Sequence, residues 1–187
     1  YAKTDSEICM TLRAAEIPAV AYTADFVQAL SECRNGVVEE DSRGVITSSN
    51  LAAVVDDPEG FRIITLQRSA KNVSRDALSA EIAFVFREAG AEVFSHSSFS
   101  GWLLAEDSPL VLRAAELYER LFGRKPEIET THGGVECGMI QEKYPEMLII
   151  SLGPTIEACH TVQERMSVQS LEETERFLFA LIAELQE

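Results

Sequence analysis

The sequence predicts a mixed α/β protein made of two successive units with different layouts. Three observations support this fold class. Strand-like and helix-like apolar patterns alternate along the first half, a polar stretch beginning at Ser97 changes the character of the chain, and the second half alternates helices with strongly apolar runs. We therefore expect one unit over residues 1–98 and a second over residues 99–187.

The first unit is expected to contain a strand, a helix, a hairpin of two strands, a second helix and a last strand. The hairpin is predicted by the run Asp56-Asp57-Pro58-Glu59-Gly60, whose residues favour turns. Thr23 or Asp25 can cap the first helix, and Ser74 can cap the second. This order is the ferredoxin-like pattern, which gives an antiparallel sheet with helices on one face. The expected ranges are 7–12, 26–34, 46–55, 61–68, 74–90 and 91–94.

The second unit is expected to alternate helix, strand, helix, strand and helix. Ser108-Pro109 marks a helix start and Gly123 its end, while Ser170-Leu171-Glu172-Glu173 matches a capping box. The continuously apolar run Met147–Leu152 is typical of a strand buried on both faces. This pattern predicts part of a three-layer α/β sheet, and we expect its other strands to come from residues outside this chain. The expected ranges are 108–123, 126–131, 135–144, 147–152 and 170–185.

Composition argues against two classes of partner. The formal net charge of −15 would repel phosphate backbones, so we expect no nucleic-acid partner. The apolar runs are too short to cross a bilayer, so we expect no membrane partner. The cysteines are scattered without a C-x-x-C pair, which is typical of reduced thiols and predicts a cytoplasmic protein.

Two stretches carry residues that suit chemistry, Thr131–Gly138 and Ser151–His160, and each follows a predicted strand. Gly134 lies in a turn whose amides could hold an anion, or the glycines could simply allow a tight strand-to-helix turn. His160 could bind a metal or be an ordinary surface residue. Cys137 could act as a nucleophile near a helix start, but no base is placed beside it by spacing.

Arg68 ends an apolar face of the predicted strand 61–68. Ile64, Leu66 and Arg68 share that face because side chains alternate along a strand. A guanidinium in this place can reach solvent along its apolar stem, or it can bind a carboxylate with its planar fork. The residues alone leave both interpretations open.

Several of these stretches resemble segments of one enzyme family, the bacterial aminoacyl-histidine dipeptidases (peptidase D, the Xaa-His dipeptidases). His132-Gly133-Gly134-Val135-Glu136-Cys137-Gly138 is similar to their H-A-G-L-E-C-G stretch. Gly153-Pro154-Thr155-Ile156 with Ala158-Cys159-His160 is similar to their G-P-T-I-x-x-A-H segment, and Leu66-Gln67-Arg68-Ser69 to their I-R-S-S strand. The resemblance covers most of the chain and is most specific from Arg68 onward.

The resemblance implies a di-zinc metallopeptidase that hydrolyses Xaa-His or other dipeptides, in which Mn or Co can stand in for zinc. It implies that residues 1–98 belong to a ferredoxin-like lid and that residues 99–187 are the C-terminal part of the catalytic domain. It further implies that His160 is a zinc ligand, that Arg68 binds the substrate carboxylate, and that Gly134 contacts the substrate through its backbone.

The sequence also departs from the family pattern. The H-x-D ligand pair, the bridging Asp and the Glu-Glu pair that such enzymes carry upstream are not found here. A catalytic zinc takes about three protein ligands, whereas this chain offers one. We therefore expect a C-terminal fragment that lacks the general base, binds no zinc tightly by itself and is inactive alone. The intact enzyme could form a homodimer, and the alternative is a non-catalytic module that dimerises or binds a small ligand.

Overall fold

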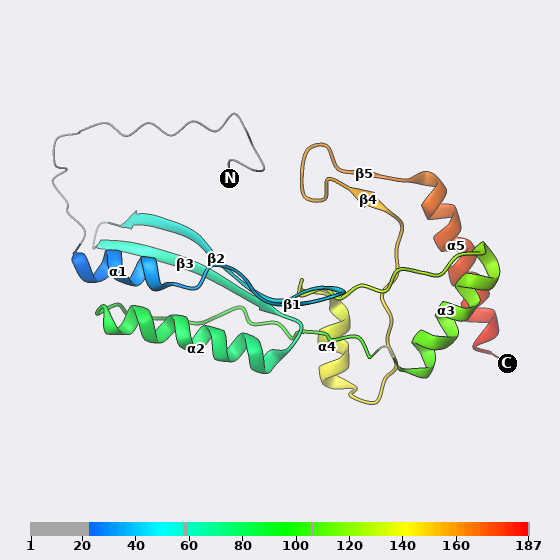
Figure 1. The fold of residues 1–187 in the computed structure, drawn as a ribbon, viewed down its shortest axis with the longest axis horizontal. Coiled ribbons are helices and arrows are strands. Elements are labelled where there is room, and N and C mark those ends of the chain that lie inside the picture. Colours follow the sequence, from blue (N-terminus) through cyan, green and yellow to red (C-terminus); the bar gives the residue numbers. More distant parts are fainter. Residues whose placement is uncertain (1–22, 58–59, 106, 187) are drawn as a thin grey trace.

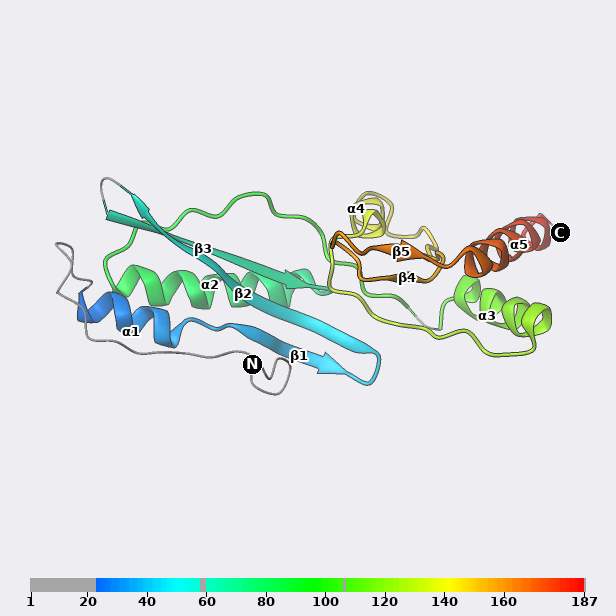
Figure 2. The same cartoon turned by 90° about the horizontal axis from the view of Figure 1, so that it is seen from above.

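The computed structural model describes residues 23–57, 60–105 and 107–186, and the prediction of a mixed α/β chain is confirmed over them. Figures 1 and 2 show an elongated arrangement, with a sheet and two helices at one end and two packed helices at the other. A short helix and a small hairpin lie between the two ends. No helix within the described ranges is long and apolar enough to cross a membrane.

The sheet at one end is antiparallel, with the strand order β1-β2-β3. The strands β2 (Gly44–Asp57) and β3 (Gly60–Ser69) form the hairpin that the turn residues predict. β1 (Gly36–Asp41) pairs with the other side of β2 and was not anticipated. Its second half is acidic and its residues are mostly exposed, so it lacks the apolar alternation that marks a half-buried strand.

Helices α1 (Ala24–Glu32) and α2 (Asn72–Glu88) cover one face of this sheet (Figure 1). Thr23 caps α1 as expected, since its hydroxyl accepts a hydrogen bond from the Phe26 amide at 3.2 Å. The expected cap at Ser74 is wrong, because α2 already begins at Asn72 and Lys71 occupies the cap position. The two helices share one buried cluster, formed by Ala29, Cys33, Leu78, Ile82 and Phe86.

The strand expected at 91–94 is also wrong. Val93 packs against the buried cluster through its side chain, but the backbone of this segment pairs with no strand in the described residues. The expected first strand, 7–12, lies outside the described residues. Of the ferredoxin-like order, two strands (β2 and β3) and two helices (α1 and α2) are observed, β1 is an additional strand, and the complete arrangement is not confirmed.

At the other end, α3 (Pro109–Phe122) packs against α5 (Val168–Glu184). Ser108 caps α3 by accepting a hydrogen bond from the Val111 amide at 3.2 Å, and Gly123 ends it in the left-handed conformation, both as predicted. The predicted capping box at Ser170 is wrong, because Ser167 caps α5 and Ser170 lies within the helix. The buried contacts between the helices come from Ala114, Leu117, Phe177 and Leu181.

Between these ends, α4 (Glu136–Lys143) forms where a short helix was expected, but the flanking strands 126–131 and 147–152 do not form within the described residues. A strand is held in a sheet by backbone hydrogen bonds to a neighbouring strand, and neither segment has such a neighbour within the described residues. Here Ile150 packs against the α3–α5 pair, while Met147 and Leu148 remain about half exposed, at 47% and 52%. The three-layer sheet is therefore not present in this part of the chain.

Candidate functional site

The open face of the sheet brings together two residues that lie far apart in sequence, Arg68 and His132. Arg68 on β3 is the register partner of Ser48 on β2, so their side chains emerge side by side from the same face. The Nε2 atom of His132 lies 2.8 Å from the Ser48 hydroxyl oxygen, and the two share a hydrogen bond. One strand pair thus carries both a guanidinium and the anchor of a loop imidazole.

The charge of this group follows from its surroundings. Burial lowers the pKa of His132 from its ordinary value of 6.5, and the positive charge of Arg68 lowers it further. His132 is therefore neutral at pH 7, and the exposed guanidinium of Arg68 carries the positive charge of the pair. An exposed arginine beside a neutral hydrogen-bonding ring can receive a carboxylate.

The loop that carries His132 lies along the end of the sheet. The Thr130 amide donates a hydrogen bond to the carbonyl of Arg43 at 3.4 Å, next to the β1–β2 turn. A side chain on Gly44 would meet the carbonyl oxygen of Thr130 at 3.0 Å, so the loop approaches the turn closely. Ile46, two residues before Ser48 on β2, is only 2% exposed.

Gly134 lies next along this loop. The hydroxyl of Thr131 accepts a hydrogen bond from the Gly133 amide at 3.1 Å, which shapes the turn before it. A Cβ atom on Gly134 would lie 3.0–3.2 Å from three atoms of the Phe99 ring, so glycine lets the backbone pass close to this ring. Because Gly134 is two residues from His132, its backbone lies within about 7 Å of the residue that contacts Ser48.

The segment 99–101 contacts the loop, the end of β3 and α4. A Cβ atom on Gly101 would lie 2.3 Å from the carbonyl oxygen of Ser69 at the end of β3. A Cβ atom on Gly138 of α4 would lie 2.3 Å from the carbonyl oxygen of Ser100. The hydroxyl of Ser100 also donates a hydrogen bond to Glu142. Sheet, segment and α4 are therefore in close backbone contact.

His160 is placed differently from Arg68 and Gly134. It lies in the loop of a small hairpin formed by β4 (Ile156–Glu157) and β5 (Arg165–Met166), which Figure 1 shows extending from the body of the chain. Its side chain is exposed, its φ is +65°, and its amide donates a hydrogen bond to a carboxylate oxygen of Glu164 at 2.6 Å.

The residues around His160 do not by themselves fit a metal ion. Within the described ranges no group of three or more His, Cys, Asp or Glu side chains comes close enough to hold one. Cys159 is exposed in the same hairpin loop, and Cys137 is half-buried in the first turn of α4. Within the described residues, His160 therefore lies apart from any set of side chains that could complete a metal site.

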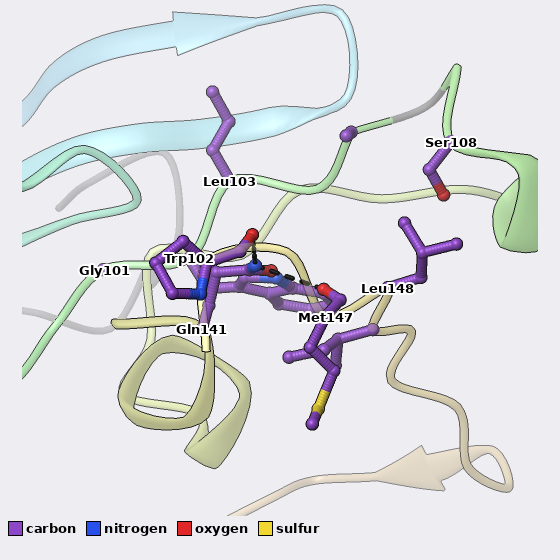
Figure 3. Close-up of a pocket in the computed structure, with 10 residues that line it drawn as sticks. Gly101, Trp102, Leu103, Ser108, Gln141, Met147 and Leu148 are labelled. Carbon is purple, nitrogen blue, oxygen red and sulfur yellow. Dashed lines mark hydrogen bonds between the residues drawn. The ribbon is translucent and has the colours of Figure 1, made fainter. Parts of the chain in front are cut away.

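A hollow of about 380 Å³ lies apart from the open face of the sheet, between α4 and the segments 101–105 and 145–149 (Figure 3). Trp102, Met147 and Leu148 contribute apolar surface. The side-chain amide of Gln141 donates hydrogen bonds to the carbonyls of Pro145 and Met147 at 2.7 and 3.1 Å. The residues lining this hollow include no charged side chain among those described, so it lacks a group to pair with a charged ligand.

Sequence reasoning singled out Arg68 and Gly134 but gave no role to His132 or Ser48. The missing signal was the strand register. Uninterrupted pairing from Asp57 and Gly60 would set Arg68 opposite Ser49, but an irregularity between Leu51 and Ala53 shifts its partner to Ser48.

Comparisons with known proteins agree with the resemblance seen in the motifs. The family model described as peptidase family M20/M25/M40 matches residues 10–184. The chain is 31% identical over 163 residues to the cytosol non-specific dipeptidase of Escherichia coli (strain K12), covering 86% of this chain and 34% of that protein.

Among crystal structures, the chain is similar to the aminoacylhistidine dipeptidase from Vibrio alginolyticus, with a TM-score of 0.72 and 29% identity. That match covers 88% of this chain and 36% of the other. The chain therefore spans about a third of the length of the relatives it matches.

Proposed function

The chain belongs to peptidase family M20/M25/M40, and from this membership we propose that it forms part of the active site of a metal-dependent dipeptidase. The proposed reaction is the hydrolysis of Xaa-His or other dipeptides, the substrate class that the names of both relatives indicate. Residues outside these 187 would supply the general base and the remaining metal ligands.

The proposal rests mainly on one observation, namely that Arg68 lies opposite Ser48, the residue to which the loop at 131–134 is hydrogen-bonded. Arg68 presents an exposed guanidinium next to the Ser48–His132 hydrogen bond, and Gly134 follows two residues later. A dipeptide has one free carboxylate at a short distance from its single peptide bond. We assign the carboxylate to Arg68, whose planar fork suits it, and a backbone contact with the substrate to Gly134.

His160 is the proposed metal ligand of this chain, in a site that takes two zinc ions or, in their place, Mn or Co. Such ions supply a Lewis acid and an activated water. A catalytic zinc takes about three protein ligands, and the described residues offer one. We therefore expect the 187-residue chain alone to bind no zinc tightly and to be inactive.

We assign residues 1–98 to a lid and residues 99–187 to the C-terminal part of a catalytic domain. The close approach of Gly101 to the end of β3 and of Gly138 in α4 to Ser100 supports a junction at this place. A cytoplasmic location is part of the proposal and is supported by the unpaired thiols of Cys33, Cys137 and Cys159.

The non-catalytic alternative, a module that dimerises or binds a small ligand, is less well supported. Its natural pairing edge is β1, which carries Glu39, Glu40 and Asp41 and pairs irregularly with β2, and both features discourage the addition of another strand. A homodimer is compatible with the dipeptidase proposal, because Val55, Ile64 and Leu66 leave exposed apolar surface on the sheet.

The proposal is tested by assaying the full-length protein that contains this chain. We expect it to release free histidine from Xaa-His dipeptides, to lose this activity on chelation, and to regain it when zinc, Mn or Co is added. The 187-residue chain alone should show no turnover under the same conditions. A full-length protein that hydrolyses no dipeptide with any of the three metals would refute the proposal.

A further inference from the structure

His132 joins the loop that carries Gly134 to the strand pair that carries Arg68. It contacts β2 through the hydrogen bond between its Nε2 and the Ser48 hydroxyl, 2.8 Å apart. Ser48 in turn is the register partner of Arg68 on β3. His132 therefore bonds to the side chain of the residue directly opposite Arg68, and the backbone pairing of β2 with β3 connects the loop with the strand that carries the guanidinium.

We propose that His132 is a positioning residue that fixes the distance between Arg68 and the loop at Gly134, and that this distance selects dipeptides over longer peptides. The inference rests on the proposed function, because it takes Arg68 and Gly134 as the two substrate contacts. In this arrangement Arg68 holds the carboxylate of the substrate, and the loop lies beside the residue that carries the scissile bond.

The distance between Arg68 and the loop determines which length of peptide can reach both contacts. Adding one residue to an extended peptide moves its carboxylate about 3.3–3.6 Å further from the same peptide bond. Two contacts that are held apart by a fixed span can therefore accept a dipeptide and reject a tripeptide. If the loop can shift relative to Arg68, part of this discrimination is lost. A tripeptide can then set its carboxylate against Arg68 and its scissile peptide bond beside the loop at the same time.

A purely architectural role explains the contact less well. The loop has other anchors, namely the Thr130–Arg43 hydrogen bond and the packing of Gly134 on Phe99. Neither buried cluster includes His132, and its side chain is only half-buried. The chain would keep its core without this imidazole, and what would change is the link between the loop and the strand of Arg68.

The chemistry of the ring also suits this place. A neutral imidazole can bond to Ser48 without adding a second cation beside Arg68, and it leaves the guanidinium to meet the substrate. A lysine in its place would compete for the carboxylate. Glutamine can set a polar atom close to the position of Nε2, so it should keep the bond to Ser48 and serve as the conservative replacement.

The test uses the full-length protein with the substitutions His132→Ala, His132→Gln and Ser48→Ala. His96→Ala is the matched control, because His96 is exposed and its ring bonds only to the neighbouring Ser97 among the described contacts. Steady-state rates are measured with a dipeptide and with the tripeptide that extends it by one residue.

We expect His132→Ala and Ser48→Ala each to raise KM for the dipeptide about two- to tenfold, the range for one lost hydrogen bond, with kcat within about twofold. The ratio of kcat/KM for dipeptide over tripeptide should fall by a similar factor. His132→Gln and His96→Ala should behave like the wild type. The double variant His132→Ala/Ser48→Ala should be no worse than either single variant, because both remove the same contact.

Two results would overturn the inference while leaving the proposed function intact. In the first, the wild type is an active dipeptidase, and His132→Ala leaves both KM and the preference for dipeptides over tripeptides unchanged. The other is a loss of kcat with unchanged KM and a lowered melting temperature, which marks a structural role. A wild-type protein without dipeptidase activity would instead refute the proposed function itself.

A readout independent of turnover follows the imidazole directly. In NMR titrations of the 187-residue chain, Arg68→Gln should raise the pH at which His132 titrates, because a neighbouring positive charge is removed. An unchanged midpoint would mean that His132 and Arg68 do not face each other, and the inference would fall.

Discussion

Replacing Gly138 by alanine should push α4 away from the segment that joins the two ends of the molecule. An ideal Cβ atom on Gly138 would lie 2.3 Å from the carbonyl oxygen of Ser100 and 3.1 Å from that of Gly101. Carbon and oxygen atoms approach one another to about 3.3 Å at closest in ordinary packing. Because the obstructing atoms belong to the backbone, no side-chain rotation relieves the clash, and α4 must move by about 1 Å.

Two opposing effects set the size of the change. Alanine is better than glycine inside a helix by about 1 kcal/mol. Forcing an additional methyl group into a packed contact costs about 1–3 kcal/mol, and a clash with rigid backbone belongs at the upper end of that range. We therefore expect a net loss of about 1–2 kcal/mol, which lowers Tm by about 2–8 °C in a chain of this size.

Thermal unfolding followed by circular dichroism measures this effect in the 187-residue chain. Gly153→Ala is the matched control, because a Cβ atom there would meet nothing within 4 Å. That substitution should leave Tm unchanged or raise it slightly. If Gly138→Ala were as stable as the wild type, the close contact between α4 and Ser100 would be refuted.

Three further predictions follow from other parts of the chain. Phe86→Ala, in the cluster beneath the sheet, should destabilise the chain by about 3–5 kcal/mol in urea unfolding, because it opens a cavity in a packed core; a loss below about 1 kcal/mol would contradict the burial of this ring. Because the pKa of His132 is lowered in the folded chain, the unfolded chain binds a proton at this ring more readily. The contribution of neutral His132 to the free energy of unfolding is therefore complete above pH 6.5 and is lost as pH falls through the folded pKa. His132→Gln should flatten this part of the profile of stability against pH, and identical profiles for the variant and the wild type would disprove the burial effect. In the full-length protein, Arg68→Ala should mainly raise KM for dipeptides. His160→Ala should abolish metal-dependent activity and lower the metal content per protein that is measured after dialysis. Full activity in either variant would refute the role assigned to that residue.

Much of the secondary structure could be predicted because its signals are local. Ser108 and Gly123 bound α3 as expected, Thr23 caps α1, and β2 and β3 form the expected antiparallel pair. A cap or a turn depends on a few neighbouring residues, so the sequence alone contains the cause. The resemblance to a peptidase family, read from motifs around Arg68, Gly134 and His160, is likewise confirmed at the level of the family.

The errors occur where distant residues decide the outcome. The apolar runs 147–152 and 91–94 read as strands, but a strand also needs a paired neighbour, and none is present for them in the described chain. Ser74 and Ser170 looked like caps, yet α2 begins at Asn72, three residues after the last residue of β3, and Ser167 caps α5, where its amide also donates a hydrogen bond to the carbonyl of Thr155 at 3.0 Å.

The candidate site divides along the same line. The sequence by itself made Arg68 and Gly134 candidates for a role, since the guanidinium of Arg68 and the bare backbone of Gly134 have their chemistry wherever the chain places them. Only the tertiary structure decided that His132 joins them. That contact depends on a one-residue shift of register in the β2–β3 hairpin and on a loop more than sixty residues further along the chain. Side chains alternate faces along a strand, so such a shift changes which of Ser48 and Ser49 stands beside Arg68, and no local pattern contains that choice.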